Sequence, residues 1–221
     1  MKLFVSAVLK FLLGVVLLAS LLLLPAGTWH YPNAWLLMGL LFIPMFIAGL
    51  VMLWKNPELL QSRLNAKEKR GAQEIVIKLS GLMFLAGFIV AGLDFRNGWS
   101  HMPKWLTIAA AAAFLLAYTL YAEVLRENTW LSRTIEVQQG QKVVSTGLYG
   151  VVRHPMYAVT LLLFLSMPLM LGSWPAFFIF LCYPAIIVKR LLDEEKLLAK
   201  ELDGYEDYMQ KVKYRLIPFV W

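Results

Sequence analysis

Two polar segments in this otherwise apolar chain hold side chains that could bind a charged ligand. The first runs from Ser132 to Tyr157, contains three glycines and ends in Arg153-His154-Pro155-Met156-Tyr157. Pro155 suits the first position of a helix, where exposed backbone N–H groups can receive an anionic or carbonyl group. The same residues also fit a plain cytoplasmic connection in which Arg153 and His154 anchor the chain at the membrane interface.

The second segment runs from Lys189 to Leu202. On a helix, Arg190 and Glu194 share one face because they are four residues apart, and Leu191, Leu198 and Leu202 form an apolar side suited to the membrane surface. One interpretation is a solvated amphipathic helix with a weak surface ion pair. The other is a functional pair, because Arg190 and Glu194 directly continue an apolar run and ionisable groups near membrane depth mark functional sites.

Long apolar runs must position these segments. The chain has 221 residues, of which 60% are hydrophobic and 16% charged, and this excludes an ordinary water-soluble enzyme. A helix needs about 20 apolar residues to cross a bilayer core of about 30 Å. Four runs near this length predict membrane-spanning helices at residues 3–24, 34–53, 75–93 and 105–125.

A fifth apolar run, from Met156 to Val188, carries no formal charge and is too long for one ordinary span. Gly172-Ser173-Trp174-Pro175 in its middle predicts a turn between two short or tilted arms, residues 157–171 and 174–188, with kinks at Pro168 and Pro184. We therefore expect an all-α polytopic membrane protein with five or six crossings and one structural domain. Residues 1–125 form the N-terminal transmembrane helices, and residues 126–221 form a core with a cytoplasmic cap made of residues 126–154 and 189–221.

The distribution of basic residues predicts the orientation in the membrane. The loops at residues 54–78 and 126–153 are rich in Lys and Arg, whereas those around His30 and Gly172 have none. By the positive-inside rule, both termini and the two polar segments face the cytoplasm. This explains the net charge of +7 without a nucleic-acid partner. A single cysteine, Cys182, and three dispersed histidines leave little for a disulfide or a metal centre.

An ordered set of short motifs covers about the last ninety residues, with the apolar hairpin between its parts. The motifs are Gly147-Leu148-Tyr149, Arg153-His154-Pro155-Met156-Tyr157, Glu194-Glu195, Gly204-Tyr205-Glu206-Asp207-Tyr208, Val212 and Leu216-Ile217-Pro218. This set resembles the isoprenylcysteine carboxyl methyltransferase family and its relatives, the membrane phospholipid methyltransferases.

The resemblance implies that the chain binds S-adenosylmethionine in a pocket closed by its C-terminal segment. It implies that Glu194 binds the cofactor and that Arg190 contacts the substrate, so both are expected at the catalytic centre. The residues that it assigns to the cofactor are Gln138, Gln141, Lys142, Val143, Val144, Tyr149, His154, Pro155, Met156, Tyr157 and Glu194.

Two of these assignments leave alternatives open. The spacing between the acidic pair and the motif at Gly204 leaves Glu195 as an alternative to Glu194. The length of the loop varies in the family, so Gln139 or Gln141 can take the place of Gln138.

The residue types agree with this cofactor. Its ammonium group needs an anionic or carbonyl partner, its carboxylate needs donors and its adenine needs apolar or aromatic walls; Glu194, His154 and Tyr149 with Val143 are of these types. A carboxylate acceptor is already ionised at neutral pH and needs only a cation such as Arg190 to orient it. An amine or thiol must first lose a proton to a base, for which only His154 and Glu195 are nearby.

We therefore predict an integral membrane S-adenosylmethionine-dependent methyltransferase that acts on a lipophilic acceptor from the bilayer, most simply a carboxylate. The alternatives are phospholipid amine N-methylation and thiol S-methylation. A rival of another class is a non-catalytic channel or transporter subunit with Glu123, Arg190 and Glu194 along a polar pathway. The expected partners are membrane lipid and the methyl acceptor, with no nucleic acid and no metal.

Overall fold

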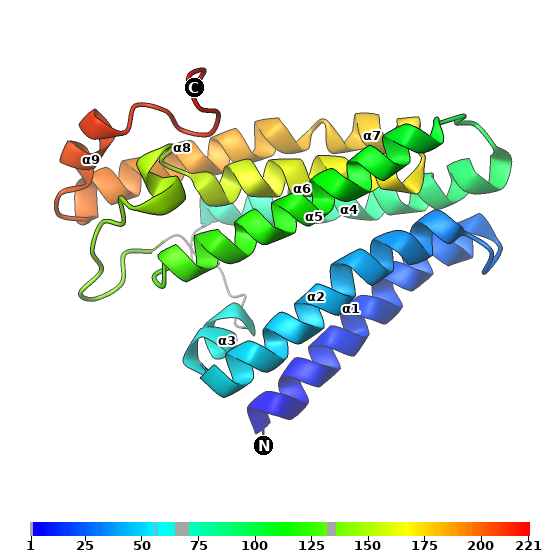
Figure 1. Cartoon of the computed structure of the whole chain (residues 1–221), viewed down its shortest axis with the longest axis horizontal. Coiled ribbons are helices and arrows are strands. Elements are labelled where there is room, and N and C mark those ends of the chain that lie inside the picture. The colour runs from blue at the N-terminus through cyan, green and yellow to red at the C-terminus, as the bar shows by residue number, and fades with distance from the viewer. Residues whose placement is uncertain (1, 56, 65–70, 132–135) are drawn as a thin grey trace.

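The computed structural model describes residues 2–55, 57–64, 71–131 and 136–221. All regular elements in these ranges are helical, which confirms the predicted all-α fold (Figure 1). In chain order they are α1 (Lys2–Ala26), α2 (Pro32–Lys55), α3 (Pro57–Leu64), α4 (Gly71–Asn97), α5 (Lys104–Glu127), the 3-10 turn η1 (Gly147–Gly150), α6 (Pro155–Leu171), α7 (Trp174–Phe180), α8 (Tyr183–Glu201) and α9 (Tyr205–Lys211).

Five stretches of the described chain are long and apolar enough to cross a membrane. They are Leu3–Ala26, Pro32–Lys55, Glu74–Asn97, Lys104–Glu127 and the 28-residue stretch Trp174–Glu201 that joins α7 and α8. Helix α6 is also apolar but has only 17 residues. The four predicted N-terminal spans and the predicted helical hairpin are therefore present, and the chain is a multi-pass membrane protein.

Small residues allow the helices to pack closely. Helix α5 packs against α6, and α4 contacts α1, α7 and α8 (Figure 1). A Cβ atom at Gly92 of α4 would lie 2.5 Å from the carbonyl oxygen of Leu22 in α1. At Gly87, one turn and a half earlier, it would lie 2.3 Å from the Phe180 ring of α7. Helix α4 thus needs glycine on both of these contact faces.

The predicted turn between the hairpin arms forms at Gly172, which ends α6 with a φ of 79°. A residue without a Cβ adopts this left-handed conformation at little cost. Ser173 then caps α7, since its Oγ accepts the backbone N–H of Ala176 at 3.2 Å. The hydroxyl of Tyr31 donates to the Leu171 carbonyl at 2.8 Å, so the turn is also tied to the N-terminal helices.

The prolines of the hairpin behave differently from each other. Pro168 lies inside a continuous α6, whereas the second arm is broken between Phe180 and Tyr183, so α7 and α8 are separate helices. Pro184 causes this break, since it has no N–H and its ring would clash with the carbonyl four residues earlier, that of Phe180. The irregularity expected at Pro184 is therefore present as a local break between α7 and α8, across which Leu181 and Cys182 keep right-handed helical backbone angles.

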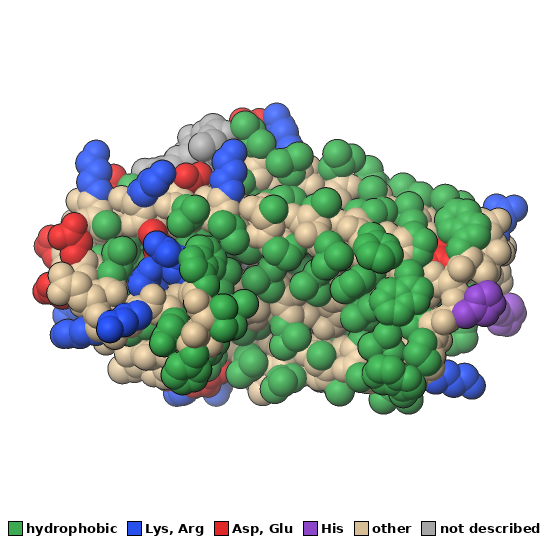
Figure 2. All heavy atoms as spheres, turned by 90° about the horizontal axis from the view of Figure 1, so that it is seen from above, with side chains coloured by type: hydrophobic (Ala, Val, Ile, Leu, Met, Phe, Trp, Pro, Cys, Tyr) green, Lys and Arg blue, Asp and Glu red, His purple; other side chains and the backbone are tan. Residues whose placement is uncertain are grey.

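The outer surface divides into an apolar middle and polar ends. Figure 2 shows hydrophobic side chains over most of the visible face, with Lys, Arg, Asp and Glu gathered at the end that holds α9. Large apolar side chains such as Leu24 and Trp54 are mostly exposed. Exposure of such a surface to water would be unfavourable, whereas the hydrocarbon core of a bilayer solvates apolar side chains well.

One sequence expectation about α8 is wrong. Leu191 and Leu202 are buried, and Leu198 is partly buried, so these leucines face the protein and not the membrane surface. The reason is that α9 and the segment before η1 cover this side of α8, with Tyr205 and Val143 packed around Leu202.

Candidate active site

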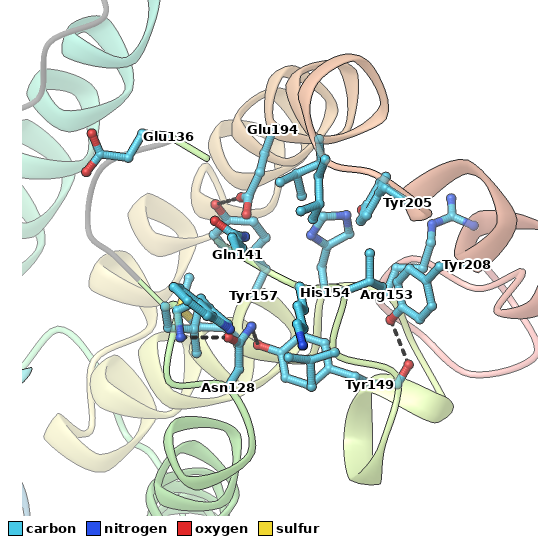
Figure 3. A pocket seen from close by; sticks show the side chains of 18 of the residues that line it. Asn128, Glu136, Gln141, Tyr149, Arg153, His154, Tyr157, Glu194, Tyr205 and Tyr208 are labelled. Carbon is cyan, nitrogen blue, oxygen red and sulfur yellow. Dashed lines mark hydrogen bonds between the residues drawn. The ribbon is translucent and has the colours of Figure 1, made fainter. Parts of the chain in front are cut away.

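A pocket lies at the polar end of the bundle, where the start of α6, the end of α8, α9 and the segment after α5 meet (Figure 3). It brings together residues that lie more than fifty positions apart in the sequence. Ten of the predicted site residues line it: Gln141, Lys142, Val143, Val144, Tyr149, His154, Met156, Tyr157, Arg190 and Glu194.

Two predicted cofactor residues do not line this pocket. The Gln138 amide donates to the Trp130 carbonyl at 2.7 Å, and its backbone N–H donates to Gln141 Oε1 at 2.9 Å. Gln138 therefore shapes the loop, while Gln141, one of its predicted alternatives, lines the pocket. Pro155 is fully buried at the start of α6, where it fixes the direction of the helix.

A single tyrosine hydroxyl connects α6 to the two charged residues of α8. Tyr157 donates its hydroxyl hydrogen to Glu194 Oε2, and the Tyr157 hydroxyl oxygen accepts a hydrogen bond from Arg190 Nε at 3.2 Å. Arg190 and Glu194 are one helical turn apart, so both can reach Tyr157 on the facing helix. The Tyr157 ring also stacks on His154, with centroids 5.7 Å apart.

The neighbouring carboxylate, Glu195, has different surroundings. It is buried. Its Oε1 accepts a hydrogen bond from Arg153 Nε at 2.7 Å and lies 3.2 Å from His154 Nε2. Its Oε2 accepts from Arg215 Nε at 2.7 Å. We call these four residues, Arg153, His154, Glu195 and Arg215, the Glu195 cluster. Glu195 thus holds the protein together, whereas Glu194 lines the pocket.

The Glu195 cluster fastens the C-terminal segment over the start of α6. The backbone N–H of Arg153 donates to the Tyr214 carbonyl at 2.8 Å, and that of His154 donates to the Arg215 carbonyl at 2.9 Å. Arg153 Nη1 also donates to the Val212 carbonyl at 2.9 Å, just beyond α9. Side-chain and backbone contacts therefore fix His154, and with it one wall of the pocket.

The opposite wall is aromatic and apolar. Tyr208 of α9 donates its hydroxyl to the Tyr149 carbonyl at 2.7 Å, and Asn128 Nδ2 donates to the Tyr149 hydroxyl at 3.0 Å. Burial raises the pKa of Tyr208 above its usual range, so this donor keeps its proton at neutral pH. Val143 and Leu202 complete this side of the pocket.

The lining combines side chains of both charge signs with apolar walls. Glu194 and Glu136 carry negative charge, and Lys142, Arg153 and Arg190 carry positive charge. Such a set suits a ligand that has an ammonium and a carboxylate at one end and a flat ring system at the other. Within the described residues, no group of three or more His, Cys, Asp and Glu side chains is placed to hold a metal ion.

Several lining residues were not predicted. Tyr205 and Tyr208 belong to a motif already noted, and their i,i+3 spacing places both on one face of α9. Arg153 is next to a predicted residue, Leu198 and Leu202 were expected at the membrane surface, and nothing in the sequence assigns the others to a site. These are Asn128, Trp130, Leu131 and Glu136.

The polar pathway of the rival channel interpretation does not include Glu123. This residue accepts hydrogen bonds from Arg126 Nε and Nη2 at 2.9 and 2.7 Å on the exposed side of α5, and it does not line the pocket. Arg190 and Glu194 are therefore grouped with the pocket residues and not with Glu123.

Parts of this chain are similar to known proteins. Residues 104–203 match the family model described as phospholipid methyltransferase. Delta(14)-sterol reductase TM7SF2 of Mus musculus is 34% identical over 91 residues, 40% of this chain and 22% of that protein. Delta(14)-sterol reductase of Methylotuvimicrobium alcaliphilum is 25% identical over 135 residues, 54% of this chain and 32% of that protein. The chain thus spans a third or less of either relative.

Proposed function

We propose that this protein is an S-adenosylmethionine-dependent methyltransferase with a lipophilic acceptor. The match of residues 104–203 to the phospholipid methyltransferase model supports this proposal and agrees with the resemblance to membrane methyltransferases seen in the sequence. The observation that carries the proposal is the pocket, which lies largely within the matched region and offers acidic, basic and aromatic groups together. S-adenosylmethionine has an ammonium, a carboxylate, a sulfonium and an adenosine, and each has a partner of suitable type there.

The residues of the pocket divide these tasks. Glu194 is the acidic partner for the ammonium group, and His154 and Lys142 are donors for the carboxylate. When bound, the cofactor supplies an electrophilic methyl group on a positively charged sulfur. The protein then has to hold the acceptor in line with that methyl group, and for this the fixed position of Tyr157 between two helices is well suited.

Arg190 is the residue proposed to orient the acceptor. It lies one turn before Glu194 in α8, on the side of the pocket that leads back into the apolar part of the helix. A lipophilic acceptor entering from the bilayer would reach Arg190 before Glu194. A guanidinium group binds a carboxylate with two hydrogen bonds, so a carboxylate acceptor fits this position best. An amine or thiol acceptor would need a base, and Glu195 is already engaged by Arg153 and Arg215.

A second candidate function is reduction of a lipophilic substrate, because both named relatives are sterol reductases. A reductase needs a hydride donor such as a reduced nicotinamide dinucleotide, and its binding would also use cationic and aromatic groups. The two candidates therefore differ first in the cofactor that the purified protein binds.

Calorimetry on the protein in detergent tests both candidates. We expect micromolar binding of S-adenosylmethionine and S-adenosylhomocysteine and no binding of a reduced nicotinamide dinucleotide; the reverse result would favour the reductase. Incubation with methyl-labelled cofactor and native lipid extract, followed by mass spectrometry, then identifies the acceptor. Arg190→Ala should spare cofactor binding and lower turnover, and loss of both together would contradict its assignment to the acceptor.

A further inference from the structure

The hydroxyl of Tyr205 is buried without a hydrogen-bond partner among the described residues. The side chain is only 4% exposed and lines the pocket from α9. Burying a hydroxyl group without a partner costs free energy, so proteins seldom leave one in this state unless a water, an ion or a ligand completes it. In Figure 3, Tyr205 lies between α9 and His154, among the side chains that surround the pocket.

The neighbouring tyrosine provides a contrast. Tyr208 is on the same face of α9, and the two ring centroids are 5.6 Å apart, yet its hydroxyl donates to the Tyr149 carbonyl at 2.7 Å. Tyr208 therefore has a structural role that is complete within the protein. Tyr205 is similarly buried and has no such bond, so within the described residues its hydroxyl lacks a hydrogen-bond partner.

The surroundings of Tyr205 indicate the kind of ligand group that it meets. Leu202, Val143 and Leu198 pack with Tyr205 and Tyr208 in one apolar cluster that lines this side of the pocket. The charged residues Arg190 and Glu194 belong to the side formed by α8 and Tyr157. The Tyr205 hydroxyl therefore meets a mainly apolar side of the pocket.

We propose that the Tyr205 hydroxyl hydrogen-bonds the edge of the purine ring of a bound adenosyl cofactor and helps select adenine at this position. This inference rests on the proposed function and assigns one residue of the same pocket. A purine has apolar faces for the leucine and valine side chains and a polar edge for a single hydroxyl. Burial, with the nearby carboxylates, raises the pKa of Tyr205 well above its usual range, so the hydroxyl keeps its proton and can donate to a ring nitrogen.

Paired measurements on Tyr205→Phe and Tyr208→Phe test the proposal. Calorimetry with S-adenosylhomocysteine gives the Kd, and thermal unfolding without ligand gives the stability. Tyr205→Phe should raise the Kd about threefold to tenfold, the value of one hydrogen bond, and leave the unfolding temperature unchanged or higher, because no bond within the protein is lost. Tyr208→Phe, the control, should lower the unfolding temperature.

Ligands with an altered purine edge test the position of the contact. The 1-deaza, 3-deaza and 7-deaza analogues of S-adenosylhomocysteine each replace one ring nitrogen with C–H, and for the analogue that lacks the contacted nitrogen wild-type and Tyr205→Phe proteins should bind equally. An unchanged Kd in Tyr205→Phe, or a loss of affinity accompanied by a loss of stability, would overturn the inference. The inference would also be overturned if the ratio of the Kd of Tyr205→Phe to that of the wild-type protein were the same for every purine analogue. Absence of S-adenosylhomocysteine binding by the wild-type protein would instead overturn the proposed function.

Discussion

Adjacent glutamates on α8 have separate roles because of the helix geometry. Successive side chains on an α-helix point about 100° apart, so Glu194 reaches Tyr157 in the pocket while Glu195 turns toward Arg153 and Arg215. Sequence alone left open which of the two binds a cofactor, because the choice depends on how α8 is rotated relative to α6. In the structure Glu194 lines the pocket and Glu195 does not, which favours Glu194 for the proposed role.

Replacing Glu194 with Gln should weaken cofactor binding about tenfold or more, because the ammonium group loses a charged acceptor. His154→Ala should have an effect of similar size. Calorimetry with S-adenosylhomocysteine measures both. Asp193→Asn, one position earlier and outside the pocket lining, is the matched control, and unchanged affinity in both pocket variants would contradict the assigned roles.

Replacing Glu195 with Gln should instead destabilise the protein by about 3–5 kcal/mol, because Arg153 would remain buried without its anionic partner. Chemical unfolding in detergent measures the change. The affinity of the folded Glu195→Gln molecules for the cofactor should equal that of the wild-type protein. A stable Glu195→Gln protein that does not bind cofactor would show that Glu195 itself belongs to the binding site.

Among the helices, sequence predicts long apolar spans well and short or interrupted elements poorly. Runs of about twenty apolar residues leave few alternatives, so α1, α2, α4 and α5 lie where expected. Helix α3 has only eight residues and a mixed composition, and it falls in a predicted loop. The break before Pro184 and the burial of Leu202 depend on packing partners distant in sequence, and periodicity cannot reveal them.

The close contact between α4 and α1 can be tested at Gly92. Gly92→Ala should destabilise the protein by about 1–3 kcal/mol, because the new methyl group would overlap the Leu22 carbonyl of α1. Gly81→Ala on the same helix, where nothing lies within 4 Å of the new Cβ, should have little effect. Thermal unfolding of both variants makes the comparison, and equal stability would contradict the close approach.

The packing of α9 against the rest of the protein should weaken at alkaline pH. Burial raises the pKa of both Tyr205 and Tyr208 above the ordinary value of about 10, so the folded state holds these protons more tightly than the unfolded state. The resulting stability is fully present below pH about 10 and is lost as pH rises further. The unfolding temperature, measured between pH 8 and 11, should fall at the upper end, and Tyr208→Phe should reduce the pH dependence.

On the scale of the whole molecule, the pocket lies at one polar end and the apolar surface occupies the middle (Figure 2). The basic loops predict that this end faces the cytoplasm. Four of the residues behind that prediction, Lys67, Lys69, Arg70 and Arg133, lie outside the described residues. The orientation therefore stays a prediction from charge.

Cysteine labelling of intact cells tests the orientation. In a Cys182→Ser background, a cysteine in place of Asp207 on α9 should resist a membrane-impermeant maleimide, whereas one in place of His101 should react. Both positions are exposed, so access depends on the side of the membrane. Reaction at Asp207→Cys with protection at His101→Cys would reverse the orientation.

The hydroxyl of Tyr157, which contacts both Arg190 and Glu194, would make the two halves of the proposed site thermodynamically dependent on each other. A ligand ammonium that engages Glu194 competes with this hydroxyl for the carboxylate and changes what the hydroxyl can offer to Arg190. Linkage then requires that a bound methyl donor alters the affinity for the acceptor by the same factor as the acceptor alters the affinity for the donor. Communication between cofactor and acceptor would thus include the Tyr157 hydroxyl and would not require movement of a helix.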